Sequence, residues 1–211
     1  MREDQTPGFA ESRAGQIAAA LRLVTVSVAF GGLSGAVSVV TGLQDHSLGL
    51  FAIGLGVAAD VTGSATLIWR FRIEQQRPGL SDATETRAAI VVAIALAVVS
   101  ILLIFESAVA LTSGSRPGTS VITLIAAGIS LLVLTPLAVA KRRLGRRMAS
   151  RALRGDGTLS GIGAATSLLA LVALVLYHAL GWWWADRVAA LVVAVVAGVE
   201  AWRTVPRARR R

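Results

Sequence analysis

The chain has 211 residues, of which 55% are hydrophobic and 16% charged, and its formal net charge is +9. Because a soluble domain usually has about 25% charged residues, this composition excludes an ordinary soluble globular protein and indicates a polytopic membrane protein. The sequence contains no cysteine, which excludes disulfides and thiolate metal sites.

Residues 1–20 lack a short apolar core followed by a small-residue cleavage site, so we interpret them as a retained cytoplasmic tail. Apolar stretches long enough to cross a bilayer as helices follow this tail. The sequence therefore predicts an all-α bundle of six transmembrane helices within residues 21–203 and a basic tail at 204–211. The predicted spans are Leu21–Leu43, Leu48–Trp69, Ala88–Leu111, Ser120–Ala140, Leu159–Leu180 and Trp183–Val199.

The basic residues predict the orientation of this bundle. All of the 21 except Arg116 and Arg187 fall on the side that carries both termini, so the positive-inside bias places the termini in the cytoplasm of a multi-pass cell-membrane protein. The connection from about Arg70 to Arg87 contains "QQRPGLSD" and is expected to be an irregular loop. The connection between the fourth and fifth spans, which starts at Lys141, is the most basic of the predicted connections. Basic runs beside membrane spans suit anionic lipid, so no nucleic-acid partner is expected.

The second span carries an acid, Asp60, in the middle of "FAIGLGVAADVTGSATLIWRF". An ionised aspartate at the centre of a membrane helix costs about 2.5–3.5 kcal/mol, and such residues are functional by default. Gly56, Gly63 and Ser64 leave room beside it for an ion or for a closely packed helix. The alternative is a protonated Asp60 that only makes a hydrogen bond inside the bundle.

Three further acids lie near the ends of predicted spans. Glu106 is close to the outer end of the third span, where its side chain can reach water. Asp156 precedes the fifth span and is expected to cap the start of that helix. Glu200 is three residues before Arg203, which predicts an ion pair on one helical face.

Small residues also line the fifth span, at Gly161, Gly163, Ala164 and Ser167. We expect this face to pack against the small-residue face around Asp60. No set of residues resembles a hydrolytic triad, a phosphate-binding loop or a redox centre, so the sequence does not predict an enzyme or a bound cofactor.

Several segments, in their order along the chain, resemble the membrane domain of the cation diffusion facilitator (cation efflux) family over about residues 20–205. They are "TGLQDHSLGLFAIGLGVAADVTGS", "SRALRGDGTLSGIGAATS" and "GWWWADRVAALVVAVVAGVEAWR", and "LIWRFRIE" is similar to a divergent bacterial subgroup. The resemblance implies a six-helix transporter, usually a homodimer, that exchanges a divalent cation such as zinc for protons.

The resemblance also implies a degenerate metal site. The family uses two ligands four residues apart on the second span, and a histidine and an aspartate four residues apart on the fifth. The matching residues here are Gly56 and Asp60 on the second span, and Leu159 and Gly163 on the fifth, so Asp60 alone is retained.

Two functions follow from these observations. The first is proton-coupled efflux of a divalent cation, with Asp60 as the ion-binding residue and oxygen donors that favour a harder cation than zinc. The second is a non-transporting structural protein, or a partner of a related transporter, on the same fold. Candidates for accessory positions in the ion site are Asp156, Ser64, Ser160 and Glu106.

Overall fold

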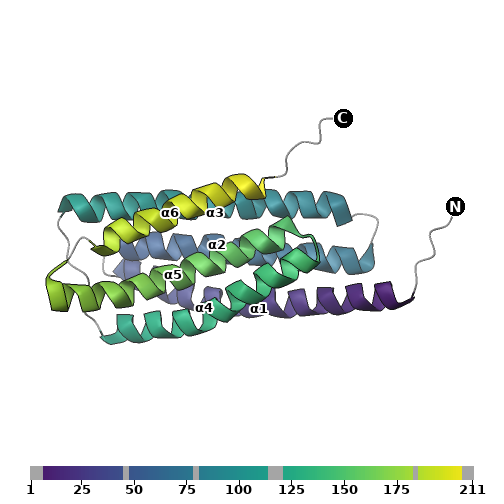
Figure 1. The fold of residues 1–211 in the computed structure, drawn as a ribbon, viewed down its shortest axis with the longest axis horizontal. Coiled ribbons are helices and arrows are strands. Elements are labelled where there is room, and N and C mark those ends of the chain that lie inside the picture. Colours follow the sequence, from purple (N-terminus) through teal and green to yellow (C-terminus); the bar gives the residue numbers. More distant parts are fainter. Residues whose placement is uncertain (1–6, 45–47, 78–80, 114–120, 183–184, 206–211) are drawn as a thin grey trace.

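The structure is a computed structural model that describes residues 7–44, 48–77, 81–113, 121–182 and 185–205. Within these residues the secondary structure consists of helices, which alternate in direction along the bundle in Figure 1. We call the end of the bundle at which α1 begins and α6 ends the terminal end. The helices are α1 (Pro7–Gln44), α2 (Leu48–Gln76), α3 (Ser81–Ser113), α4 (Val121–Arg147), α5 (Arg151–Leu180) and α6 (Ala185–Thr204).

The predicted all-α fold is confirmed for the described residues, and each predicted span overlaps one helix. The first residues of two predicted spans, 120 and 183–184, lie outside the described part of the chain. In the described part of the chain, three stretches are long and apolar enough to cross a membrane: Arg13–Ala36, Asp82–Ser113 and Arg151–Ala173. The helices extend beyond the predicted spans at the terminal end. The six-span topology and the cytoplasmic position of the termini remain predictions.

The predicted irregular loop between the second and third spans is wrong. Helix α2 continues to Gln76 and α3 already begins at Ser81, so most of this connection is helical. Ion pairs explain the extension, because Arg70 contacts Glu74 one turn further along α2 at 3.2 Å and Glu85 on α3 at 2.6 Å. Paired charges on successive turns support a helix beyond its apolar part.

The same charges join four helices at the terminal end. Arg13 of α1 contacts Glu74 of α2 at 2.6 Å. Glu85 of α3 accepts a hydrogen bond from the backbone N–H of Ala152 at 3.0 Å, in the first turn of α5. Arg70 lies between these two carboxylates with its side chain 3% exposed. Charges buried in this way stabilise the arrangement only as a complete set, since a missing partner leaves an unpaired charge.

Helices pack in neighbouring pairs, α1 with α2, α4 with α5 and α3 with α6, while α2 also packs against α3. Figure 1 shows α3 and α6 along one side of the bundle and α1 and α4 along the other. Fully buried side chains at the centre include Val24, Leu67, Phe71, Leu96 and Leu153. Large apolar side chains also cover the outside, which is the surface expected of helices solvated by lipid.

A tight turn connects α4 and α5. The backbone N–H groups of Ser150 and Ala149 donate to the carbonyls of Gly145 and Arg146 at 2.9 and 3.2 Å, which is the hydrogen-bond pattern of a Schellman motif. Ala149 has a φ of 53°, the left-handed conformation that this motif requires. The hydroxyl of Ser150 then accepts the N–H of Leu153 at 3.0 Å, so Ser150 caps α5.

Candidate functional site

Glycines allow the backbones of α4 and α5 to approach closely beside the terminal end. A Cβ atom on Gly157 would lie 3.0 Å from the backbone nitrogen of Arg142 and 3.1 Å from Cβ of Lys141. A Cβ on Gly145 would lie 2.9 Å from the backbone nitrogen of Arg154. Such contacts leave no room for larger residues. They bring the side chains of α4 within direct reach of α5.

This approach places a buried ion pair between the two helices. Nζ of Lys141 on α4 lies 2.6 Å from Oδ2 of Asp156 on α5, and both side chains are 0% exposed. The Ser64 hydroxyl of α2 donates to Oδ1 of Asp156 at 2.7 Å. Nζ of Lys141 donates to the hydroxyls of Ser160 at 3.0 Å and Ser64 at 3.3 Å. Three helices thus meet at these four side chains, which we call the buried polar cluster.

Two sequence-based interpretations are corrected by this cluster. Asp156 does not cap α5, because that helix begins five residues earlier and Asp156 faces the bundle interior. Lys141 does not belong to a solvated connection, because α4 continues to Arg147 and turns this side chain inward. The run of basic residues around Lys141 concealed the difference between its buried side chain and its exposed neighbours.

Asp60 lies beside the buried polar cluster on α2. It precedes Ser64 by four residues, which places it on the same helical face about 6 Å along the axis. Its Oδ1 atom is buried without a hydrogen-bond partner in the described part of the structure. The charges of Asp156 and Lys141 both act on it. Asp60 is therefore a carboxylate with unused binding capacity inside the bundle.

Close packing of α1 against α2 encloses Asp60 on its other side. A Cβ atom on Gly31 would lie 2.9 Å from Cγ2 of Val61 and 3.8 Å from Oδ2 of Asp60. One turn further, a Cβ on Gly35 would lie 2.7 Å from Cγ1 of Val57. The small residues that shield Asp60 from lipid thus include glycines of α1 that the sequence analysis did not single out.

The small-residue face of α5 packs differently from the prediction. Gly161 and Gly163 face α4, where the nearest atoms to a Cβ at these positions belong to Ala138 and Leu134. The contact between α2 and α5 instead runs through Gly63, whose Cβ would lie 3.2 Å from Leu159 and 3.5 Å from Oδ1 of Asp156. The expected pairing of the Asp60 face with the α5 glycines is wrong because α4 fills that space.

Residues without side-chain donors occupy three of the four positions where the family resemblance places metal ligands. Leu159 is part of the hydrophobic core, and Cδ1 of Leu134 would lie 2.8 Å from a Cβ at Gly163. Gly56 lies on α2 one turn before Asp60. Within the described residues, no group of three or more His, Cys, Asp or Glu side chains is placed to hold a metal ion.

Glu106 does not join Asp60. It lies on α3, where the charge of Arg187 on α6 acts on it, and its Oε1 atom is buried without a hydrogen-bond partner in the described structure. The predicted pair of Glu200 and Arg203 is present, with 3.9 Å between the charged atoms. The structure therefore brings Asp60, Ser64, Asp156 and Ser160 together and leaves Glu106 in a separate place.

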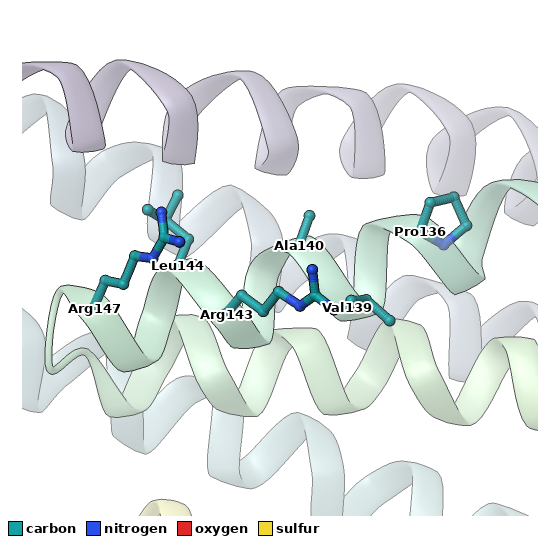
Figure 2. Close-up of a pocket in the computed structure, with 6 residues that line it drawn as sticks. All are labelled: Pro136, Val139, Ala140, Arg143, Leu144 and Arg147. Atoms are coloured by element: carbon teal, nitrogen blue, oxygen red, sulfur yellow. The ribbon is translucent and has the colours of Figure 1, made fainter.

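A groove of about 440 Å³ lies on another face of α4. Figure 2 shows its lining residues on successive turns of that helix, with the basic side chains of Arg143 and Arg147 and the ring of Pro136 among them. Lys141 is not part of the lining. Helix α4 thus has one face toward the buried polar cluster and a different face toward this groove.

A bundle of long apolar helices around buried acidic, basic and hydroxyl groups defines a polytopic membrane protein with a polar site inside it. The sequence profile of the cation efflux transmembrane domain matches residues 24–209, and the chain belongs to this family. The family resemblance found in the sequence is thereby confirmed, and it supports a membrane cation transporter. No curated protein matches the chain.

Proposed function

We propose that this protein exports a divalent cation across the cell membrane in exchange for protons, with Asp60 as the residue that binds the ion. The observation that carries the proposal is the unpartnered Oδ1 atom of Asp60, buried one helical turn from Ser64. Asp156 and Ser160 supply further oxygen atoms on the facing helix. A buried carboxylate without a partner is costly unless a cation or a proton satisfies it.

The donors favour a hard cation. Carboxylate and hydroxyl oxygens suit Mg²⁺, Mn²⁺ or Ca²⁺, whereas zinc prefers nitrogen and sulfur ligands. Because two carboxylates among the described residues, Asp60 and Asp156, are assigned to the site, the cation is expected to keep several of its waters, as Mg²⁺ usually does. Leu159 occupies the position of the family's histidine, which removes the donor that would favour zinc.

The orientation and the transport cycle follow from the same elements. We place the terminal end, with its many arginines, in the cytoplasm. Rocking of helices about the midplane site would expose Asp60 alternately to the two sides of the membrane. We also propose that the functional unit is a homodimer or a pair with a related transporter.

Flux measurements in proteoliposomes test the proposal. Uptake of Mg²⁺, Mn²⁺, Ca²⁺ and Zn²⁺ is measured with and without a pH gradient, using wild-type protein and the Asp60→Asn variant. We expect gradient-dependent uptake of a hard cation by the wild type and none by the variant. Thr62→Val is a matched control, since Thr62 is exposed on the same helix and its hydroxyl donates to the backbone carbonyl of Ala58 within that helix. Equal flux in the wild type and Asp60→Asn would reject Asp60 as the ion-binding residue.

A non-transporting role is the second candidate, and one observation favours it. Asp156 already has Lys141 as its counter-ion, so the buried polar cluster is a stable structural contact in its own right. In that case Asp60→Asn would leave both the stability and any partner binding nearly unchanged. Absence of flux for every cation, in wild-type protein that is folded and correctly inserted, would favour this second role.

A further inference from the structure

Lys141 is the only lysine among the 21 basic residues of the chain. Its side chain is fully buried, whereas the arginines beside it, Arg142 and Arg143, are exposed. Lysine and arginine differ in shape: the ammonium is a compact charge with three donors, and the guanidinium is a planar fork with five. The only ammonium side chain of this sequence, that of Lys141, therefore lies inside the buried polar cluster.

The surroundings of Nζ resemble the coordination of a small cation. Its neighbours are Oδ2 of Asp156 at 2.6 Å, Oγ of Ser160 at 3.0 Å and Oγ of Ser64 at 3.3 Å. These oxygens match the three donors of an ammonium group in number. They are also the oxygens, apart from those of Asp60, that the proposed function assigns to the transported cation.

We propose that Lys141 is a tethered cation that occupies part of the transport site and competes with the transported ion. A divalent cation can bind both Asp60 and Asp156 only if the ammonium leaves Asp156 and its serine partners. Lys141 thereby determines how tightly the site holds a divalent cation. This inference rests on the proposed function, since it concerns the affinity of the same site.

Charge explains the effect of such a competitor. With both carboxylates ionised, Asp60 and Asp156 carry two negative charges, and the ammonium cancels one of them. The charged groups that face Lys141 in the described structure are Asp156 on α5 and Asp60 on α2, while Arg13 of α1 is engaged by Glu74. A site left with one net negative charge attracts a divalent cation less than a site with two. Weak binding in turn permits release, which a transporter requires.

Replacement of Lys141 by methionine tests the inference. Lys141→Met keeps an unbranched apolar stem but removes the charge, so a divalent cation should become the counter-ion of Asp156. We expect the variant to bind Mg²⁺ or Mn²⁺ at least tenfold more tightly than the wild type in equilibrium dialysis. The cation should also raise the melting temperature of the variant more than that of the wild type, because binding stabilises the folded state.

Arg146→Met is the matched control. Arg146 is exposed in the last turn of α4, so this change removes the same charge from the same helix outside the cluster. We expect it to leave the cation affinity unchanged. Equal affinities of the wild type and Lys141→Met would overturn the inference. An equal increase in cation affinity in Lys141→Met and Arg146→Met would also overturn it, since such an increase would reflect only the lower net charge of the protein.

A measurement on the wild type covers the case in which Lys141→Met does not fold. In protein labelled with [¹³Cε]lysine, the single lysine gives one side-chain signal. Addition of saturating Mg²⁺ or Ca²⁺ should shift this signal, because the ammonium leaves its carboxylate. An unchanged signal in protein that transports the cation would overturn the inference and leave the proposed function intact. Absence of both binding and flux in the wild type would overturn the proposed function and the inference with it.

Discussion

The change Asp156→Asn offers the sharpest test of the buried polar cluster. It removes the carboxylate that pairs directly with the fully buried Lys141 ammonium, while the amide oxygen can still accept the hydrogen bond from Ser64. Loss of one partner of a buried ion pair costs about 3–5 kcal/mol. Because Lys141 also keeps its bonds to Ser64 and Ser160, we expect the lower part of this range, about 3 kcal/mol.

Thermal unfolding in detergent micelles, followed by tryptophan fluorescence, measures this loss. For a chain of this size, 1 kcal/mol corresponds to about 2–4 °C, so the melting temperature should fall by about 6–12 °C. The double variant Lys141→Met/Asp156→Asn removes both charges of this pair and should recover most of the loss. Equal destabilisation in the single and double variants, or an unchanged melting temperature in Asp156→Asn, would show that the pair does not act as a charged contact.

Three further predictions concern the junction of α4 and α5, and thermal unfolding tests them all. Ala149→Gly should stabilise the protein by about 1 kcal/mol, since alanine is strained at its φ of 53°. Ser150→Ala removes the cap of α5 and should cost about 1–2 kcal/mol, so a neutral result would contradict the capping role. Gly157→Ala should cost about 1–3 kcal/mol because the new Cβ meets the backbone of Arg142. Gly128→Ala is its control, with open space around the added Cβ; equal effects would contradict the close packing of α4 and α5.

The sequence was sufficient to predict the helices, the family and an acid, Asp60, within the helical bundle. Apolar length and a single acid inside an apolar stretch are local signals that do not depend on how the helices pack. The pair of Glu200 and Arg203 was predictable for the same reason, because both residues lie on one helical face. Predicting such features requires knowledge only of the helical repeat and of the free-energy cost of burying a charge.

The pairing of Lys141 with Asp156 was not predictable in the same way. Lys141 lies in the basic run "AKRRLGRR", where hydropathy assigns every residue to the membrane surface. Two features indicated a different environment for Lys141: it is the only lysine of the sequence, and it lies on the helical face of the buried residues Leu137, Gly145 and Met148. Which helix meets which face depends on tertiary packing, so the contact with Asp156 could not follow from either segment alone.

The extension of the helices at the terminal end was missed for a related reason. Charged residues after Trp69 were interpreted as a loop, although Arg70 and Glu74 are four residues apart and form an ion pair on one face of α2. Glu85 completes the arrangement from α3. Ion pairs between helices allow charged segments to form buried helical turns, and hydropathy alone does not detect such pairs.

Simultaneous recording of cation entry and proton exit in one preparation of proteoliposomes tests the central claim most directly. A cation-sensitive dye and a pH-sensitive dye inside the vesicles would report both movements after addition of Mn²⁺ or Mg²⁺. We predict that protons leave as the cation enters, and that both signals disappear together in Asp60→Asn while Thr62→Val retains them. Cation entry without proton movement, or coupled signals that persist in Asp60→Asn, would contradict the account.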